Sequence, residues 1–158
     1  RISWQQFTVG SGYQLWNIDS EQESAEFIVE KKDGNVVGED LAVLVSVNAD
    51  VEPALATTRS DLPLFRGFVH IRHPKEASYL IKNAGQAAHI AKLVADEIRN
   101  ARTEFHLRGR IHLFMAVPAG LAMMVGQLLN TLGPIQTYEH IPTDPTGRYH
   151  PAALLVPK

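Results

Sequence analysis

Polar side chains that can bind an anion stand at the ends of four apolar runs in this sequence. The residues at these ends are Ser46 and Asn48, Arg72 and His73, Pro118 and Ala119, and Tyr138 and Glu139, of which Ser46, Asn48, Arg72, His73 and Tyr138 have side chains that can donate a hydrogen bond to an anion. Arginine and protonated histidine donate charge-assisted hydrogen bonds to phosphate or carboxylate oxygens. A helix that starts at Pro118 would also offer free backbone N–H groups at residues 119–121, together with the positive end of its dipole. This combination favours a bound anion.

Aromatic side chains near the same positions could hold a flat ring. Tyr138, Trp16 or Trp4 could stack on a nucleobase whose edge Asn48 or Glu139 reads by hydrogen bonds. Each residue also has an ordinary structural interpretation, because Tyr138 would serve equally as a core aromatic, Asn48 as a turn former and Arg72 as a solvated charge. The arrangement as a whole is therefore more informative than any single member.

Several kinds of chemistry have no sequence motif. The chain lacks the G-x-G-x-x-G and G-x-x-x-x-G-K-[ST] patterns, which argues against a dinucleotide cofactor and a P-loop triphosphate. It has no G-x-S-x-G elbow for a strained serine nucleophile and no cysteine for a disulfide, a thiolate or a zinc site. His70 and His73 are three apart in a predicted strand, so their side chains should diverge, and a metal site there is disfavoured. His112 is expected to be a hydrogen-bonded core residue.

Periodicity predicts the elements that position these residues. Apolar, β-branched runs predict buried strands at 41–47, 65–71, 110–117 and 135–141. Helices are expected at 52–59, 84–105 and 118–132, with Asn83 and Gln86 as a capping box and Pro118 as a first helical residue. Residues 4–30 favour an antiparallel hairpin divided at Gly10 to Gly12, residues 31–35 a turn, and residues after Pro142 a proline-rich tail.

Strands that alternate with helices predict the fold class. The expectation is an α/β, Rossmann-like, mostly parallel sheet flanked by helices, with an antiparallel addition from the N-terminal segment. Ligands bind such sheets outside the carboxyl ends of the strands, where the four pairs of candidate residues stand.

Composition is that of one globular domain. The chain has 158 residues with a net charge of −2, which divides into 11 acids and 4 bases over residues 1–61 and 6 acids and 11 bases over residues 62–158. That basic excess is too dilute for duplex DNA but favours a small anion. The longest apolar tract, 111–129, is too interrupted for a membrane span, and the absence of cysteine favours a reducing cytoplasm. We expect residues 1–158 to form a single domain of a longer protein.

One segment resembles a known family. The run from Ile111 to Ala122 (IHLFMAVPAGLA), followed by Gly126, LGPIQ at 132–136, the pair Tyr138-Glu139 and YHP at 149–151, is similar to the C-terminal signature of SAVED domains. The resemblance is specific over about residues 110–155 and compatible over 41–105, and the first 40 residues carry no matching motif.

The resemblance implies a Rossmann-like fold related to the CARF sensors of CRISPR systems. It implies a sensor, with no cofactor or metal, that binds a cyclic di- or trinucleotide and oligomerises to activate a fused effector, such as an HNH nuclease, in bacterial antiphage (CBASS) signalling. No membrane or direct nucleic-acid binding is implied. The phosphate-facing role falls on Pro118 and Ala119 and the base-contacting role on Tyr138 and Glu139, whereas Ser46, Asn48, Arg72 and His73 enter only by their places at strand ends.

Two other functions remain open from the sequence. In the first, the same cleft is a phosphodiesterase that cleaves a cyclic nucleotide, with His73 as acid or base near Arg72. In the second, the chain is a structural module whose partner is only protein. Recovery of the ligand intact or linearised separates the sensor from the enzyme, and the module would bind no nucleotide.

Overall fold

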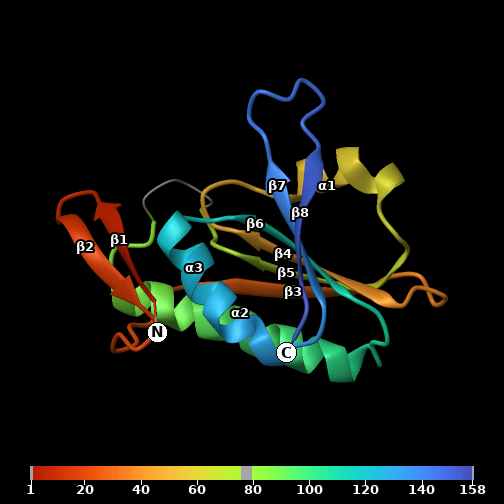
Figure 1. The fold of residues 1–158 in the computed structure, drawn as a ribbon, viewed down its shortest axis with the longest axis horizontal. Helices are drawn as coiled ribbons and strands as arrows, with labels where there is room; N and C mark the ends of the chain where they lie inside the picture. Colours follow the sequence, from red (N-terminus) through yellow and green to blue (C-terminus); the bar gives the residue numbers. More distant parts are fainter. Residues whose placement is uncertain (1, 76–79, 158) are drawn as a thin grey trace.

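A six-stranded sheet forms the centre of the molecule. The computed structural model describes residues 2–75 and 80–157. The strand order is β3-β5-β4-β6-β7-β8, and the bounds are β3 (Ile28–Asp33), β4 (Asp40–Ser46), β5 (Phe65–Arg72), β6 (Ile111–Ala116), β7 (Ile135–His140) and β8 (Tyr149–Leu155) (Figure 1). The inner strands β5, β4, β6 and β7 run parallel to one another. The edge strand β3 is antiparallel to β5, and the edge strand β8 is antiparallel to β7. The predicted α/β fold with a mostly parallel sheet is confirmed.

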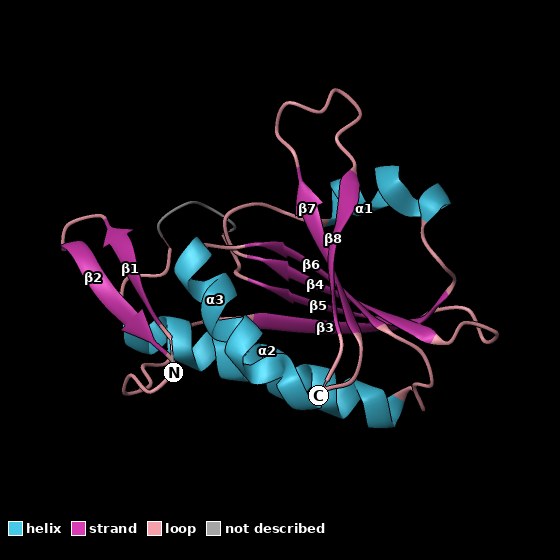
Figure 2. Cartoon of the chain, in the orientation of Figure 1, coloured by secondary structure: helices cyan, strands magenta, loops and turns pink. Residues whose placement is uncertain are grey.

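The apolar run at the centre of β4 explains why this strand lies inside. Alternate residues face opposite sides, and both sides are covered. Leu41, Val43 and Val45 pack in a core with α2 (Ala84–Glu104) and α3 (Ala119–Leu128). Ala42 and Leu44 pack in a second core with α1 (Glu52–Thr58). The long helices therefore cover one face of the sheet and α1 the other, as Figure 2 shows.

The helix starts follow the predicted signals with two differences. The Asn83 side chain accepts a hydrogen bond from the Gln86 N–H at 2.9 Å, as a capping box requires. The Gln86 side chain, however, accepts from the Lys82 N–H at 3.0 Å instead of reaching the Asn83 N–H. Pro118 is the extended N-cap of α3, with ψ 143°, so the prediction that it is the first helical residue was wrong. The α-helix ends at Leu128 and one 3-10 turn, Leu129–Thr131, completes it.

The two ends of the chain depart most from the sequence prediction. The hairpin predicted around Gly10 to Gly12 is confirmed as β1 (Ser3–Thr8) and β2 (Gly12–Asn17), but it forms a sheet of its own. The turn predicted at 31–35 was placed too early, because β3 continues through Asp33 as the antiparallel addition to the main sheet. The predicted proline-rich tail contains β8, where an edge strand tolerates Pro151.

The β1–β2 hairpin lies against the start of the chain's apolar helix. Its strands contact α3, and β2 also contacts α2 (Figure 1). Trp16 on β2 is only 1% exposed and belongs to the same core as α2 and α3. Within residues 2–75 and 80–157, no helix is both long and apolar enough to cross a membrane.

Candidate functional site

Two cavities open at the edge of the sheet where the parallel strands end. The first, which we name the hairpin cavity, has a volume of about 200 Å³ and lies between the β1–β2 hairpin and the starts of the loops after β4 and β6. Its lining residues are Gln6, Phe7, Thr8, Val9, Trp16, Asn48, Ile81 and Pro118. The second, the outer cavity, has a volume of about 500 Å³ and reaches from the β4–α1 loop to the ends of β7 and β8. Its lining residues are Asn48, Ala49, Asp50, Ala54, Met115, Ala116, Val117, His140, Pro142 and Tyr149.

Asn48 lines both cavities and connects them. Its backbone N–H donates to the Ala116 carbonyl at 2.8 Å, which fixes the residue across the gap between β4 and β6. Its side-chain oxygen is buried and lacks a hydrogen-bond partner among the described residues. Asn48 was predicted as a site residue from its place after the strand, and it now stands at the junction of the two cavities.

Unpartnered polar atoms concentrate in the hairpin cavity. The described residues have four buried side-chain N or O atoms without a hydrogen-bond partner, and three of them, Thr8 Oγ1, Trp16 Nε1 and Asn48 Oδ1, belong to residues that line this cavity. A buried polar atom without a partner costs free energy, so such groups normally meet water or a ligand. Thr8 and Trp16 are 5% and 1% exposed, so bulk solvent does not supply that partner.

The start of α3 is partly occupied by the protein itself. The Gly120 N–H donates to Gln6 Oε1 at 3.1 Å, so the prediction that the amides of residues 119–121 are all free was wrong at this residue. The hairpin approaches so closely that a Cβ on Gly120 would lie 2.8 Å from the Trp16 ring and 3.0 Å from the Trp4 ring. Pro118 lines the hairpin cavity, and Ala119 is exposed at the helix start. The signal for Gln6 and Thr8 was absent from the sequence, because only the docking of the hairpin brings them to this position.

Ser46 is completely buried and its hydroxyl is used within the protein. Its Oγ lies 2.7 Å from His70 Nε2 and accepts from the Val51 N–H at 3.1 Å. Asp50 Oδ1 approaches the same nitrogen of His70, at 4.0 Å. A catalytic triad needs the carboxylate on the other ring nitrogen, so this cluster does not have the geometry of an activated serine. Ser46 instead holds the β4–α1 loop, which carries Asn48.

Arg72 is the last residue of β5 and His73 follows it, and the two residues have different partners. The Arg72 guanidinium lies 3.4 Å from both carboxylate oxygens of Glu30 on β3. The backbone N–H of His73 donates to the Ser46 carbonyl at 2.9 Å, and its ring packs edge-on against Phe27. Burial lowers the pKa of His73 below its usual value, opposed by Glu26. The structure therefore does not place these two side chains in the lining of either cavity.

Tyr138 and Glu139 on β7 are also outside the two cavities. The Tyr138 hydroxyl lies 2.7 Å from His112 Nδ1, and its ring stacks on Phe114 with 4.3 Å between centroids. His112 Nε2 lies 2.8 Å from Asp40, and burial nevertheless lowers the pKa of His112. The prediction of a hydrogen-bonded core histidine at His112 is confirmed. Glu139 is exposed.

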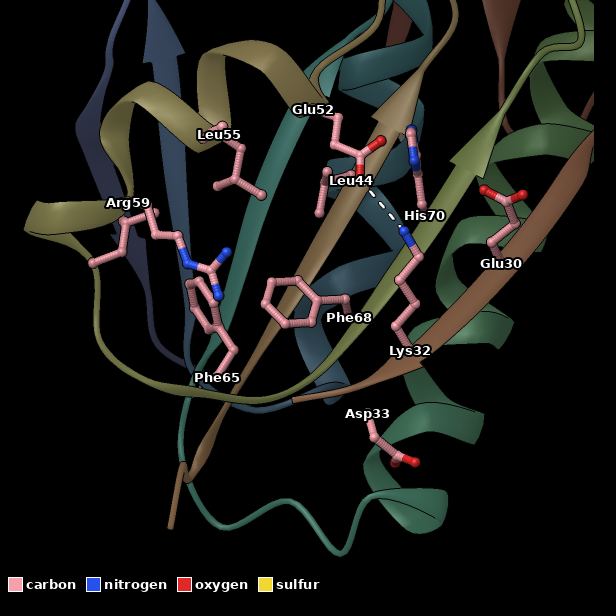
Figure 3. A pocket seen from close by; sticks show the side chains of 12 residues that line it. Glu30, Lys32, Asp33, Leu44, Glu52, Leu55, Arg59, Phe65, Phe68 and His70 are labelled. Atoms are coloured by element: carbon pink, nitrogen blue, oxygen red, sulfur yellow. Dashed lines mark ion pairs between the residues drawn. The ribbon is translucent and has the colours of Figure 1, made fainter. Parts of the chain in front are cut away.

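A third cavity, of about 260 Å³, lies between α1 and the sheet (Figure 3). Phe65, Phe68 and Leu44 give it an apolar floor, and Lys32 at its rim forms an ion pair with Glu52 at 3.5 Å. Ligand atoms of Asp50, Glu52 and His70 lie within 4.8 Å of one another, a spacing that suits a metal ion. Each of the three already has a partner in the protein, since Glu52 pairs with Lys32, Asp50 accepts from the Glu52 N–H and His70 Nε2 lies 2.7 Å from Ser46 Oγ.

The sequence matches the model of one family of sensor domains. Residues 4–155 match the family model of SAVED, described as the SMODS-associated and fused to various effectors sensor domain. No curated protein matches the chain in sequence.

Solved structures with this fold include SAVED/CARF-domain containing receptors named Cap4. The Acinetobacter baumannii receptor with the cyclic trinucleotide 3'3'3'-cAAA aligns with a TM-score of 0.76 at 19% identity and covers 98% of this chain. The same receptor with 2'3'3'-cAAA aligns with a TM-score of 0.71 at 20% identity, and the alignment covers 90% of this chain. The Moraxella osloensis receptor aligns with a TM-score of 0.56 at 20% identity, and the alignment again covers 90% of this chain. This chain spans 33%, 30% and 28% of those chains respectively, about a third of each receptor.

Proposed function

We propose that this chain, which belongs to the SAVED family of sensor domains, binds a cyclic di- or trinucleotide at the carboxyl edge of its parallel strands. The observation that carries the proposal is the pair of cavities that meet at Asn48 on that edge. In open α/β sheets this edge is the place where ligands bind. The Acinetobacter baumannii Cap4 receptor, which has the same fold, was solved with two cyclic trinucleotides, and this supports the ligand class.

The predicted site residues take different parts in this proposal. Asn48, Pro118 and Ala119 contact the ligand, since the first two line the cavities and the third stands exposed beside them. Ser46 positions Asn48 by holding the β4–α1 loop. At the same edge Arg72, at the end of β5, is the cation for a phosphate of the ligand and would exchange its contact with Glu30 for it, while His73, whose pKa is lowered by burial, is a neutral hydrogen-bonding group.

Tyr138 and Glu139 complete the proposed set on β7. Tyr138 acts through packing, because its hydroxyl and one ring face are engaged by His112 and Phe114. Glu139 is exposed and available to a ligand that extends along β7.

We further propose that ligand binding favours an oligomeric state, which activates an effector fused to the sensor. Ligand can shift such an equilibrium only by its difference in affinity for the two states. The family description, with its fusion to various effectors, supports this proposal. The phosphodiesterase alternative has no observation in its favour, since His73 packs against Phe27 and lines neither cavity.

The experiment is a thermal-shift panel of cyclic di- and trinucleotides with 3',5' and 2',5' linkages, followed by calorimetry of any hit. A ligand at 100 times its Kd adds about 2.7 kcal/mol to the folded state, which for a domain of this size raises Tm by roughly 5–11 °C. The ligand is then recovered and analysed by mass spectrometry. A folded domain that responds to no member would overturn the sensor proposal, and a linearised ligand would replace it with the enzyme.

A further inference from the structure

We infer that the hairpin cavity seats one neutral nucleobase of the cyclic ligand, with Thr8, Trp16 and Asn48 reading its edge and the phosphates remaining outside. The inference rests on the proposed function and assigns it a base-binding subsite. It also gives a role to the N-terminal hairpin, which the sequence connected with a nucleobase only through Trp4 and Trp16.

The chemistry of the cavity walls excludes a phosphate from this position. Among the residues that the structure describes, every side chain lining the cavity is uncharged. At the helix start beside the cavity, the Gly120 N–H is already taken by Gln6. A phosphate enclosed without a cation would lose its hydration with little in exchange, whereas a neutral base loses far less.

The unpartnered atoms offer the pattern that a base edge needs. The Trp16 indole nitrogen is only a donor, the Asn48 side-chain oxygen only an acceptor, and the Thr8 hydroxyl either. A base edge presents a donor beside an acceptor, such as the N6 amino group and the N1 or N7 nitrogen of adenine. Apolar Val9, Ile81 and Pro118 supply the walls against which a flat ring can lie.

The position of Trp16 favours contact through its N–H over stacking. The residue is only 1% exposed and a Cβ on Gly120 would lie 2.8 Å from its Cε3 atom, so the ring is packed against α3 and has no open face for stacking. The hairpin is fixed to that helix by the Gln6–Gly120 bond, at 3.1 Å, and by two bonds between Ile2 and Gln127, at 3.1 and 3.2 Å. The hairpin is thereby held in place before a ligand arrives, which reduces the ordering cost of binding. The polar atoms of Thr8, Trp16 and Asn48 are themselves buried, so the base reaches them through a small movement of the side chains around the cavity.

The first part of the test follows the indole N–H of Trp16 by proton–nitrogen NMR. The chain has 2 tryptophans, so W4F assigns the two indole signals. Adenosine, which has a base and no phosphate, is expected to shift the Trp16 signal, and inorganic phosphate is expected to leave it in place. The reverse pattern, a shift with phosphate and none with adenosine, would overturn the inference.

The second part measures the Kd of 3'3'3'-cAAA by calorimetry for wild type, T8V and W16F. Each substitution removes one hydrogen bond to the base, so the Kd should rise about 5- to 10-fold. T103V is the matched control, because Thr103 is exposed on α2 and lines none of the three cavities. W16F changes a buried residue, so T8V, which keeps the side-chain shape, decides the outcome if W16F does not fold.

The two proposals fail in different ways. A T8V protein that is folded and binds cAAA with the wild-type Kd overturns the base subsite, while the wild-type binding itself still supports the sensor. A wild-type domain that binds no cyclic nucleotide overturns the sensor, and the adenosine titration then decides the base subsite separately.

Discussion

A pair of glycine substitutions in one helix tests how closely the hairpin is docked. Gly120 and Gly126 both lie in α3, and both gain helix propensity of about 0.5–1 kcal/mol when replaced by alanine. A Cβ at Gly126 would meet nothing within 4 Å. A Cβ at Gly120 would lie 2.8 Å from Trp16 Cε3 and 3.2 Å from Gln6 Oε1. The two variants therefore differ in the contact with the hairpin.

The magnitude follows from that difference. Inserting a methyl group into a packed contact costs about 1–3 kcal/mol, and the propensity gain is common to both variants. G126A should be more stable than wild type by about 0.5–1 kcal/mol, and G120A less stable than G126A by about 1–3 kcal/mol. Because the new methyl group pushes against Trp16 and Gln6, G120A should also weaken cAAA binding, while G126A should not.

Urea unfolding followed by circular dichroism gives the free energies, and calorimetry gives the Kd values. The hairpin contributes a small part of the surface that unfolding exposes, so the m-values of the two variants should equal that of wild type. The change in stability should then appear as a shift of the urea midpoint. Equal stability and equal cAAA affinity for G120A and G126A would refute the close docking on which the hairpin cavity depends.

Three further predictions concern the polar groups around the sheet. S46A leaves the buried Val51 N–H and the His70 ring without a partner, so urea unfolding should show a loss of about 1–3 kcal/mol, whereas S60A at an exposed serine should show none. Y138F removes the partner of His112 Nδ1 and should cost about 1–3 kcal/mol, with Y13F, at a residue 71% exposed, as the unchanged control. Hydrogen bonds from Thr146, and to a smaller extent from His150, lower the pKa of Asp144 from its usual 3.8 to about 2. The ionised Asp144 carboxylate therefore stabilises the fold fully at a pH above 3.8, and this contribution is lost as the pH falls toward 2. In D144N the dependence of Tm on pH between 2 and 4 should be shallower than in wild type, and an unchanged slope would contradict the assignment.

The inner strands were predictable because their signal is local. The run from Leu41 to Val47 is apolar on both faces, and only a strand covered on both sides buries such a run. The edge strands were harder. β3 contains Lys31, Lys32 and Asp33, which resemble a turn in composition, and β8 contains Pro151, which disfavours an inner strand. The place of β3 is set by pairing with β5, which is distant in the sequence, and that of β8 by pairing with the preceding strand β7 across residues 141–148.

The candidate site was predictable as an edge of the sheet and not as a set of contacts. Asn48 and Pro118 were expected at the carboxyl ends of strands, and the cavities lie there. Thr8 and Gln6 could not be expected, because their role depends on the docking of a hairpin on α3. Tyr138 stood at a strand end in the sequence, but the direction of its side chain toward His112 depends on tertiary packing.

The two outer strands have a consequence for the growth of the sheet. An open strand edge offers a row of N–H and C=O groups on which another chain can pair. On β3 that edge carries successive charges at Lys31, Lys32 and Asp33, and on β8 Pro151 removes one N–H from the row. The charges make the β3 edge a poor template, and the gap at Pro151 interrupts the row on β8, so both edges carry features that limit the width to which the sheet can grow.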